Sequence, residues 1–444
     1  MPTIVLPDDA RTIIDRLHDA GYECYAVGGC VRDCLLGMTP HDWDFATSAL
    51  PDEIERVFSD LVTVDVGKRY GTIAVLLNGH SYEVTTYRVD GDYTDARHPD
   101  EVRFSPCLRD DLSRRDFTVN AMAYDPIGGL YDAFDGERDL RYRVIRCVGD
   151  PTHRFGEDAL RVLRALRFSS VLGFSIEPAT ERAIFSCCDR LSDIAPERLM
   201  RELLRLLCGD NVSAVLRRYR SVIAVFIPEL SGTFDFAQNT PHHNRDVYKH
   251  IVASIKNIEP DPVLRTTMLF HDIGKPMSLV VDRRGISHFK GHPMLSAAMS
   301  EEILRRLCCS NNFIDDVCTL IRYHDERLTP DPPMLKRYLK TLGERRMRML
   351  LSVQRADILA QSMYLRQEKL STLSQCEQEV ERILSSGECY RLSMLAVNGR
   401  DILHLGVSAG VRIGELLDEV LDKVIDGELL NDRDALLSYL RQRI

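Results

Sequence analysis

The sequence lacks any run of about 18 uncharged apolar residues, which is what a membrane-spanning helix requires. The N-terminal stretch, MPTIVLPDDARTIID, has no basic segment followed by an apolar core, so we expect no secretory signal. No CxxC pair occurs, and the 13 cysteines stand alone or as adjacent pairs. An odd number of scattered thiols is typical of a reducing compartment. We therefore expect a cytoplasmic protein that binds no membrane and whose cysteines are mostly buried and reduced.

An excess of basic residues is also missing. Asp and Glu number 67 against 57 Lys and Arg, which gives a formal net charge of -10. This balance disfavours a protein that coats nucleic acid non-specifically, but it allows a nucleic-acid enzyme with a local basic site. Hydrophobic residues make up 44% of the 444 residues, enough for buried cores in roughly three domains of ~150 residues each.

The first 145 residues or so have an α+β pattern. Residues 24–27 predict a short strand that ends at a Gly-Gly turn, followed by a helix over residues 31–36. Residues 71–77 and 81–87 predict a β-hairpin joined by Asn78-Gly79. From about residue 150 the pattern becomes helical, for example over residues 157–170, 197–207, 247–255 and 333–342. Residues 234–243 and 328–333 predict connecting segments.

Gly28 and Gly29 lie where the predicted strand gives way to the helix. Two glycines let the backbone approach a phosphate group, and the start of a helix presents free N–H groups to it. Arg32, one turn further along, adds a positive charge. Taken alone, such a pair of glycines is most often an ordinary turn.

Three carboxylates indicate a metal site near this turn. Asp42 and Asp44, in the sequence HDWDF, project to one face if they lie on a strand. Two adjacent carboxylates are costly unless a cation neutralises them, and their hard oxygen atoms favour Mg²⁺. Glu83, in the second strand of the predicted hairpin, is either a third ligand or an exposed edge residue. A phosphate cradle beside such carboxylates suits nucleotidyl transfer with two metal ions, one at the attacking hydroxyl and one at the leaving pyrophosphate.

Four motifs follow one another over about residues 20–210: GGCVRDCLLG, HDWDFAT, DLSRRDFTVNAMAYDP and EDALRVLRALRF. In this region the chain resembles the class II tRNA nucleotidyltransferases, or CCA-adding enzymes, and the related bacterial poly(A) polymerases. The resemblance implies that Asp42 and Asp44 hold Mg²⁺ and, with Glu83, are catalytic. It also implies that a second set of residues binds the nucleotide: Gly28, Gly29, Arg32, Arg115, Asp116, Asn120, Asp158, Arg161, Arg164 and Arg167.

The segment from Glu157 to Arg167 predicts one helix, on which Asp158 and Arg161 are neighbours. This spacing alone indicates an ordinary surface ion pair. Cytosine and adenine, however, both present an amine donor beside a ring-nitrogen acceptor, and a carboxylate beside a guanidinium complements both. Uracil and guanine present the reverse order and leave polar groups unpaired, which is costly. The resemblance assigns the selection of C and A, without a template, to Asp158 and Arg161.

Residues 87–104 form a charged segment rich in Gly and Asp, a composition that predicts a mobile loop. The segment resembles the flexible loop of enzymes that complete the whole CCA end. An ordinary surface loop is the alternative.

A second set of histidines and aspartates lies in the helical half. His271 and Asp272 are adjacent in FHDIGKP, and imidazole with carboxylate is a typical ligand set of transition-metal hydrolases. FHDIGKP and the element GHP resemble the HD phosphohydrolase superfamily over about residues 240–360. The resemblance implies metal ligands at His250, His271, Asp272 and Asp357, and a possible second metal at His292 and His324. It implies either a phosphatase or phosphodiesterase for damaged tRNA ends or a structural platform for tRNA.

Together these features predict an α+β fold: a nucleotidyltransferase head with a small mixed sheet, followed by all-α regions. We expect a head over residues 1–148, a neck over 149–230 for nucleotide selection and tRNA binding, an HD-like domain over 240–360 and a C-terminal helical region over 361–444. The predicted function is template-independent addition and repair of the 3′-CCA end of tRNA from CTP and ATP. The alternatives are a poly(A) polymerase, an HD phosphohydrolase with a nucleotide-binding head and, less favoured, a tRNA-binding scaffold. The oligomeric state stays open.

Overall fold

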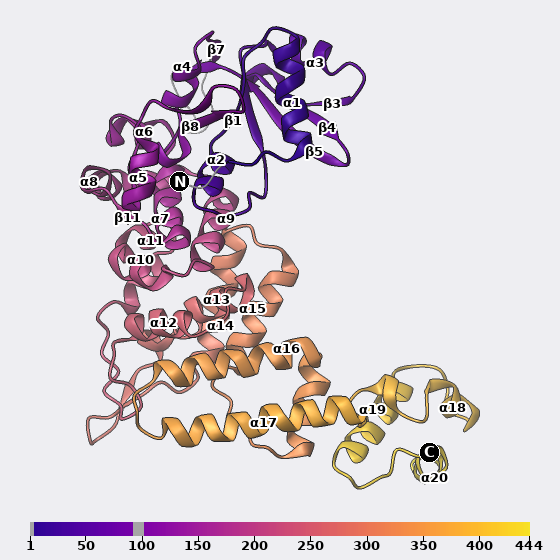
Figure 1. Ribbon diagram of the computed structural model, residues 1–444. Coiled ribbons are helices and arrows are strands. Elements are labelled where there is room, and N and C mark those ends of the chain that lie inside the picture. The colour runs from indigo at the N-terminus through magenta and orange to yellow at the C-terminus, as the bar shows by residue number, and fades with distance from the viewer. Residues whose placement is uncertain (1–3, 92–101) are drawn as a thin grey trace. The chain divides into compact units, whose positions relative to one another are not determined.

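The computed structural model describes residues 4–91 and 102–444. The chain divides into two compact units, unit 1 over residues 1–228 and unit 2 over residues 229–444 (Figure 1). Unit 1 combines a sheet with helices, whereas unit 2 is almost entirely helical. The predicted α+β fold class is therefore confirmed, while the finer domain boundaries inside each unit stay predictions.

Seven strands form one mixed sheet in unit 1, in the order β3-β4-β5-β2-β1-β8-β9. Their bounds are β1 (Cys24–Val27), β2 (Asp44–Thr47), β3 (Val62–Gly67), β4 (Thr72–Leu77), β5 (His80–Thr86), β8 (Met122–Asp125) and β9 (Gly129–Asp132). β2 runs parallel to β5, and the other neighbouring strands are antiparallel. Asn78 and Gly79, both with positive φ, form the tight turn between β4 and β5, so the predicted hairpin is confirmed.

The two faces of this sheet have different neighbours because side chains alternate along each strand. On one face, Tyr82 donates to Asp9 of α1 (Asp8–Asp19), and α3 (Pro51–Val57) packs beside α1 (Figure 1). On the other face, Val27 and Ala46 pack against Leu108 and Leu112 of α4 (Leu108–Ser113). Asp44 and Glu83, paired in register on β2 and β5, belong to this second face.

The other helices of unit 1 are α2 (Gly29–Leu35), α5 (Gly136–Tyr142), α6 (Pro151–Glu157), α7 (Leu160–Leu172), α8 (Pro178–Cys187), α9 (Pro196–Leu207), α10 (Val212–Arg218) and α11 (Arg220–Ala224). Two short strand pairs complete it, β6 (Arg88–Asp90) with β7 (Val102–Phe104) and β10 (Val144–Ile145) with β11 (Ser175–Ile176). The central part of the predicted mobile loop, residues 92–101, lies outside the described residues.

The helix predicted over residues 157–170 is wrong at its start. α6 ends at Glu157, and Asp158 has the extended backbone angles φ -139° and ψ 104°. Its side chain accepts from the Leu160 N–H at 3.0 Å, which satisfies a free donor at the start of α7. The expectation that Asp42 and Asp44 lie on one strand is also wrong. β2 begins only at Asp44, and Asp42 lies in the preceding loop.

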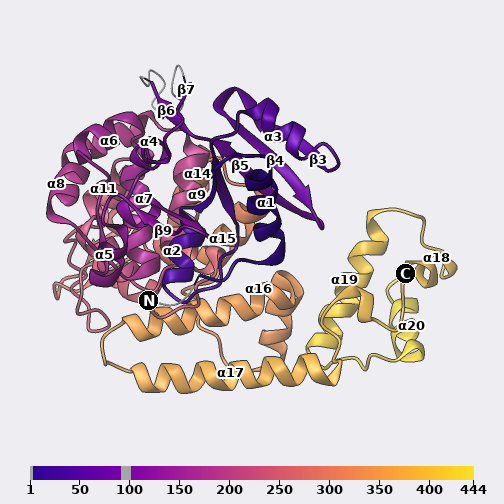
Figure 2. The ribbon, with the colours of Figure 1, turned by 45° about the horizontal axis from the view of Figure 1, so that its top comes forward.

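Unit 2 consists of helices and one small hairpin, β12 (Val280–Val281) with β13 (Ser287–His288). Its helices are α12 (Val247–Lys256), α13 (Pro262–Phe270), α14 (His292–Arg306), α15 (Asn311–Tyr323), α16 (Pro332–Ala360), α17 (Arg366–Ser386), α18 (Gly399–His404), α19 (Val411–Ile425) and α20 (Arg433–Arg441). α16 and α17 lie side by side in both views (Figures 1 and 2). Gly343, with φ 74° and ψ 167°, interrupts α16. In the described parts of the chain, every helix is too short or too polar to cross a membrane.

Candidate functional site

The Gly-rich turn of unit 1 brings a backbone bend and an arginine into close approach. Gly28 has φ 80°, a conformation that favours glycine, and α2 begins at the next residue. A Cβ atom on Gly28 would lie 2.6 Å from Nη1 of Arg115. Only glycine therefore lets the Arg115 guanidinium lie against the start of α2, the place where the sequence predicted phosphate binding.

Hydrogen bonds connect this turn to α7. Arg32 donates through Nη1 to Oδ1 of Asn120 at 2.5 Å, and the Asn120 amide donates to Asp116 at 3.0 Å. Arg164, on α7, donates through Nε to the other oxygen of Asp116 at 2.8 Å. Although burial opposes the shift, the Arg164 guanidinium and the Asn120 amide hold the pKa of Asp116 well below its ordinary value. The structure thus brings the predicted nucleotide-binding residues of three motifs into one network.

The aromatic ring of Phe168 has three guanidinium groups around it. The Cζ atoms of Arg32, Arg164 and Arg167 are 5.1, 5.6 and 4.1 Å from its ring centroid. Contacts at these distances are attractive because the ring face is electron-rich. Arg167 also forms an ion pair with Glu202 of α9 at 3.0 Å. Phe168 therefore packs against arginines from both the Gly-rich motif and α7.

Asp42, Asp44 and Glu83, here called the carboxylate cluster, are exposed residues. Partial burial raises the pKa of Asp44, an effect that Arg115 opposes and the negative charge of Asp42 reinforces. Partial burial and repulsion by Asp44 and Asp42 likewise raise the pKa of Glu83. Asp44 and Glu83 are register partners on β2 and β5, and Asp42 precedes Asp44 by two residues, so the predicted ligands lie in one region. A set of carboxylate oxygens with only partly balanced charge fits a hard divalent cation such as Mg²⁺.

Asp158 and Arg161, in contrast, do not form the predicted pair. Asp158 binds Arg198 of α9 at 2.9 Å, and Arg161 binds Glu157 at 2.5 Å. Asp158 is not helical, so Asp158 and Arg161 do not lie on successive turns of one helix as predicted. Sequence reasoning missed Arg198, which lies 40 residues beyond Asp158 and on another helix.

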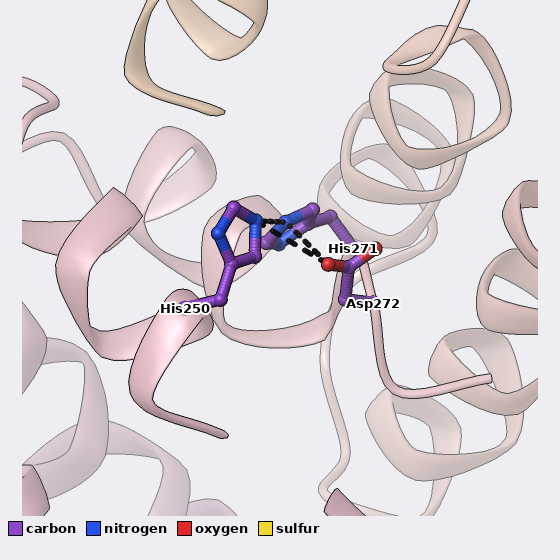
Figure 3. A group of neighbouring side chains, drawn as sticks. All are labelled: His250, His271 and Asp272. Atoms are coloured by element: carbon purple, nitrogen blue, oxygen red, sulfur yellow. Dashed lines mark hydrogen bonds and ion pairs between the residues drawn. The ribbon is translucent and has the colours of Figure 1, made fainter. Parts of the chain in front are cut away.

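In unit 2 the structure gathers all six predicted residues: His250, His271, Asp272, His292, His324 and Asp357. We call this buried group the HD cluster. Figure 3 shows His250, His271 and Asp272 turned toward one another. Oδ2 of Asp272 lies 3.4 Å from Nε2 of His250 and 3.3 Å from Nε2 of His271. Oδ1 lies 3.3 Å from Nε2 of His292 and 3.8 Å from Nε2 of His324.

The surrounding backbone orients three of these histidines. Nδ1 of His271, His292 and His324 each lies within 2.8 Å of the carbonyl three residues earlier, so Nε2 of each is directed at Asp272. Neither carboxylate oxygen of Asp272 has a hydrogen-bond partner of good geometry, although the residue is 1% exposed. Buried imidazoles and a buried carboxylate with spare lone pairs fit two transition-metal ions that share Asp272.

Charge balance in the HD cluster involves a residue that sequence reasoning missed. Lys275 Nζ lies 2.7 Å from Oδ2 of Asp272 and donates to Gln238. Although burial opposes the shift, His271 and Lys275 hold the pKa of Asp272 well below its ordinary value. Burial also acts against the charge of His271, but Asp272 raises its pKa to about 10. Lys275 is part of the motif FHDIGKP and could have been found there.

Three family models match the chain. The Poly A polymerase head domain matches residues 24–146, and the probable RNA and SrmB-binding site of polymerase A matches residues 173–231. The putative domain 2 of tRNA nucleotidyltransferase matches residues 292–440. The first match lies in unit 1, the second lies in unit 1 except for its last three residues, and the third lies in unit 2.

Curated relatives match about half of the chain. The CCA-adding enzyme of Leuconostoc mesenteroides is 50% identical over 208 residues, which are 47% of this chain and 51% of that protein. The CCA-adding enzyme of Geobacillus stearothermophilus is 45% identical over 225 residues, 50% of this chain and 55% of that protein. The chain thus spans about half the length of the curated relatives that it matches.

Solved structures match nearly the whole chain. A CCA-adding enzyme of Thermotoga maritima, complexed with tRNA_CCA, has a TM-score of 0.59 and 22% identity, and covers 99% of this chain and 96% of its own. That level of identity supports the fold alone. The CCA-adding enzyme of Bacillus stearothermophilus, in complex with CTP, has a TM-score of 0.72 and 30% identity over 99% of this chain and 98% of its own. Because identity at that level extends over almost all of both chains, this chain belongs to the family of CCA-adding enzymes, as its four head and neck motifs predicted.

Proposed function

We propose that this protein adds the 3′-terminal CCA sequence to tRNA from CTP and ATP, releasing pyrophosphate at each step. The observation that carries the proposal is the network in unit 1, where the Gly-rich turn, the carboxylate cluster and the arginines of α7 meet through Arg115 and Asp116. The likeness to a CCA-adding enzyme in complex with CTP supports the same substrate.

Arg32 and Arg115 have the geometry to hold the triphosphate. Both guanidinium groups lie against the start of α2, whose first N–H groups are free for an anion. Asn120 and Asp116 fix Arg32 and Arg164 in place, so that the positive charges are oriented before the nucleotide binds. Less ordering of these side chains is then needed when the triphosphate binds.

Asp42, Asp44 and Glu83 would hold Mg²⁺ at the solvent-exposed start of β2, beside the neighbouring strand β5. When bound there, the ion neutralises the charges that develop on the attacking and leaving oxygens. The three carboxylates orient the ion, and Arg115, which acts on the charge of Asp44, joins the carboxylate cluster to the phosphate site.

Asp158 and Arg161 would select the base by accepting from and donating to the edge shared by cytosine and adenine. Each side chain now has another partner, so selection requires Asp158 to leave Arg198 and Arg161 to leave Glu157. Arg198 is the guanidinium that already lies beside Asp158. Selection would therefore depend on α9 as well as α7, because Arg198 of α9 holds Asp158 before the base binds.

The direct test is a tRNA that lacks its CCA end, incubated with each triphosphate separately. We expect incorporation of two residues from CTP alone, one further residue once ATP is added, and none from UTP or GTP. Long tails made from ATP alone would instead identify a poly(A) polymerase.

The selection step is tested by Asp158→Asn, Arg161→Ala and Arg198→Ala. We expect Asp158→Asn to lower the preference for CTP over UTP by about 100-fold, because the unpaired groups no longer reject uracil. The effects of the two arginine variants then decide which guanidinium acts with Asp158. An unchanged preference in all three variants contradicts base reading by these residues.

A second function is favoured by the HD cluster, in which one buried carboxylate, Asp272, serves two groups of histidines. We propose that unit 2 hydrolyses phosphoesters when loaded with a transition metal. Water adds to phosphorus, the P–O ester bond breaks, and the alcohol leaves with one proton from the water. Protein loaded with Mn²⁺ is expected to hydrolyse p-nitrophenyl phosphate and Asp272→Asn is expected not to, whereas Asp44→Ala keeps this activity and loses CTP incorporation.

A further inference from the structure

Two segments that are distant in the sequence meet beside the HD cluster. The Ser362 N–H donates to the His242 carbonyl at 2.7 Å, and the Ser362 hydroxyl donates to the Pro241 carbonyl at 2.7 Å. Arg245 Nη1 donates to the Ala360 carbonyl at 2.6 Å. These bonds hold the connector before α12 against the segment between α16 and α17.

A chain of hydrogen bonds leads outward from the HD cluster through this junction. Gln361 Nε2 donates to Oδ2 of Asp357 at 2.7 Å. Lys369 Nζ donates to Oε1 of Gln361 at 2.6 Å and lies 3.3 Å from Nδ1 of His242. His243, next to His242, has its ring centroid 4.7 Å from that of His250. Lys369 is therefore two hydrogen bonds from a predicted metal ligand.

Lys369 carries a positive charge that its surroundings do not balance at close range. Among the residues that the structure describes, no carboxylate forms an ion pair with it, and its hydrogen-bond partners, His242 and Gln361, are neutral. Asp325 and Asp357 act on it only from a greater distance. Because the side chain is half-buried, a cation in this setting gains from an anionic ligand.

An exposed aromatic ring adjoins this cation. Tyr364 is 51% exposed, and its ring centroid lies 5.0 Å from that of His242 in a T-shaped arrangement. The next residue, Leu365, has φ 54°, a left-handed conformation that is uncommon for a leucine. The bend at Leu365 separates Tyr364 from the start of α17 and keeps the ring at the surface beside His242.

We propose that Tyr364, His242 and Lys369 form a binding site for a nucleoside phosphate, whose base stacks on Tyr364 and whose phosphate binds Lys369. The proposal rests on the phosphoesterase function of unit 2 and specifies its substrate class. A phosphate ester without a base makes no use of Tyr364, whereas every nucleobase presents a face that stacks on an aromatic ring. The hydrogen bonds through Gln361 connect Lys369, the phosphate-binding residue of this site, to Asp357 of the HD cluster.

The test measures binding by calorimetry to the full chain, with and without Mn²⁺. The probes are adenosine 3′-phosphonate, whose carbon–phosphorus bond resists hydrolysis, and methylphosphonate, which lacks the nucleoside. We expect the nucleoside probe to bind at least roughly tenfold more tightly. Tyr364→Ala is expected to remove this advantage and leave methylphosphonate binding unchanged, whereas Tyr364→Phe keeps it. Lys369→Met is expected to weaken both probes by roughly tenfold.

Tyr142→Ala is the matched control, because Tyr142 is a 69% exposed tyrosine in unit 1. If Tyr364→Ala leaves the advantage of the nucleoside probe intact, the site is overturned even when p-nitrophenyl phosphate is hydrolysed. If the probes behave as expected but no hydrolysis occurs, the site stands and the phosphoesterase function fails. An RNA hairpin that ends in the same phosphonate separates the two sources of ligand: tighter binding than the mononucleotide indicates an RNA end, and equal binding a free nucleotide.

Discussion

In unit 1 the carboxylate cluster faces solvent, whereas in unit 2 the HD cluster is enclosed by helices. Asp42, Asp44 and Glu83 repel one another, and Arg115 balances only part of their charge. In the HD cluster, backbone carbonyls orient the histidines and Lys275 contributes a balancing charge. The proposed addition reaction brings a tRNA end and a triphosphate together, so its site would have to stay open. A buried site has to be complete within the protein, because water cannot compensate for missing partners.

The largest contrast is expected in catalysis by unit 1. Asp44→Ala is expected to lower CTP incorporation by at least about 10³-fold, because a carboxylate of the predicted Mg²⁺ site is lost. The rate is measured on tRNA that lacks CCA. Asp15→Ala, an exposed aspartate of α1, serves as the control. Comparable rates of CTP incorporation for the two variants would show that Asp44 is not a residue of the catalytic site.

Stability is expected to respond in the opposite way. Asp272→Ala is expected to lower the free energy of unfolding of metal-free protein by about 3 kcal/mol, because Lys275 and the histidines lose a buried partner. Asp44→Ala is expected to change it by less than about 0.5 kcal/mol, since Asp44 is exposed. Urea unfolding followed by far-UV circular dichroism reports the helices, and the fluorescence of Trp43, the single tryptophan, reports unit 1. Equal effects of the two variants would mean that enclosure does not distinguish the clusters.

Competition between protons and metal ions is a further expected property of the enclosed HD cluster. The pKa of His271 is raised to about 10, so in metal-free protein the proton stabilises the folded state at lower pH and is lost as the pH rises through that value. A metal ion has to displace this proton. The affinity for Mn²⁺ is therefore expected to rise with pH, by up to about tenfold per unit for one released proton. Calorimetric titrations between about pH 6 and pH 9 measure this slope. A flat affinity would contradict it.

The smallest effect concerns the Gly-rich turn. Gly28→Ala and Gly21→Ala both place alanine at a positive φ, 80° and 89°, so both are expected to cost about 1 kcal/mol of stability. Only at Gly28 does the added Cβ meet Arg115, because Gly21 has no atom within 4 Å. Gly28→Ala alone is therefore expected to weaken CTP binding several-fold, as measured by the KM for CTP. Equal KM values for the two variants would show that Arg115 does not need this close approach.

Sequence reasoning succeeded where the determining interactions are local. The hairpin at Asn78-Gly79 and the strand over residues 24–27 depend on turn chemistry and alternation within a few residues. The six residues of the HD cluster were found because their motifs resemble a known superfamily. Their roles as ligands stay predictions, as do the roles assigned to the head residues.

Sequence reasoning failed where a side chain alters the backbone conformation of a helix or contacts a residue distant in the sequence. A helical period does not reveal that Asp158 has extended backbone angles, accepts from the Leu160 N–H and so stands between two helices. Nor does it show that Arg198 lies beside Asp158, or that Lys369 meets His242 across 127 positions. Such contacts depend on how helices pack, and periodicity in one segment carries no information about its partner.

The position of Asp272 has a consequence for stoichiometry. One oxygen faces His250 and His271, and the other faces His292 and His324. In the proposed two-ion site, removing His292 or His324 would deprive one ion of a ligand, whereas Asp272→Ala would deprive both. Binding of the two ions would therefore be coupled through Asp272, and Asp272→Ala would weaken both.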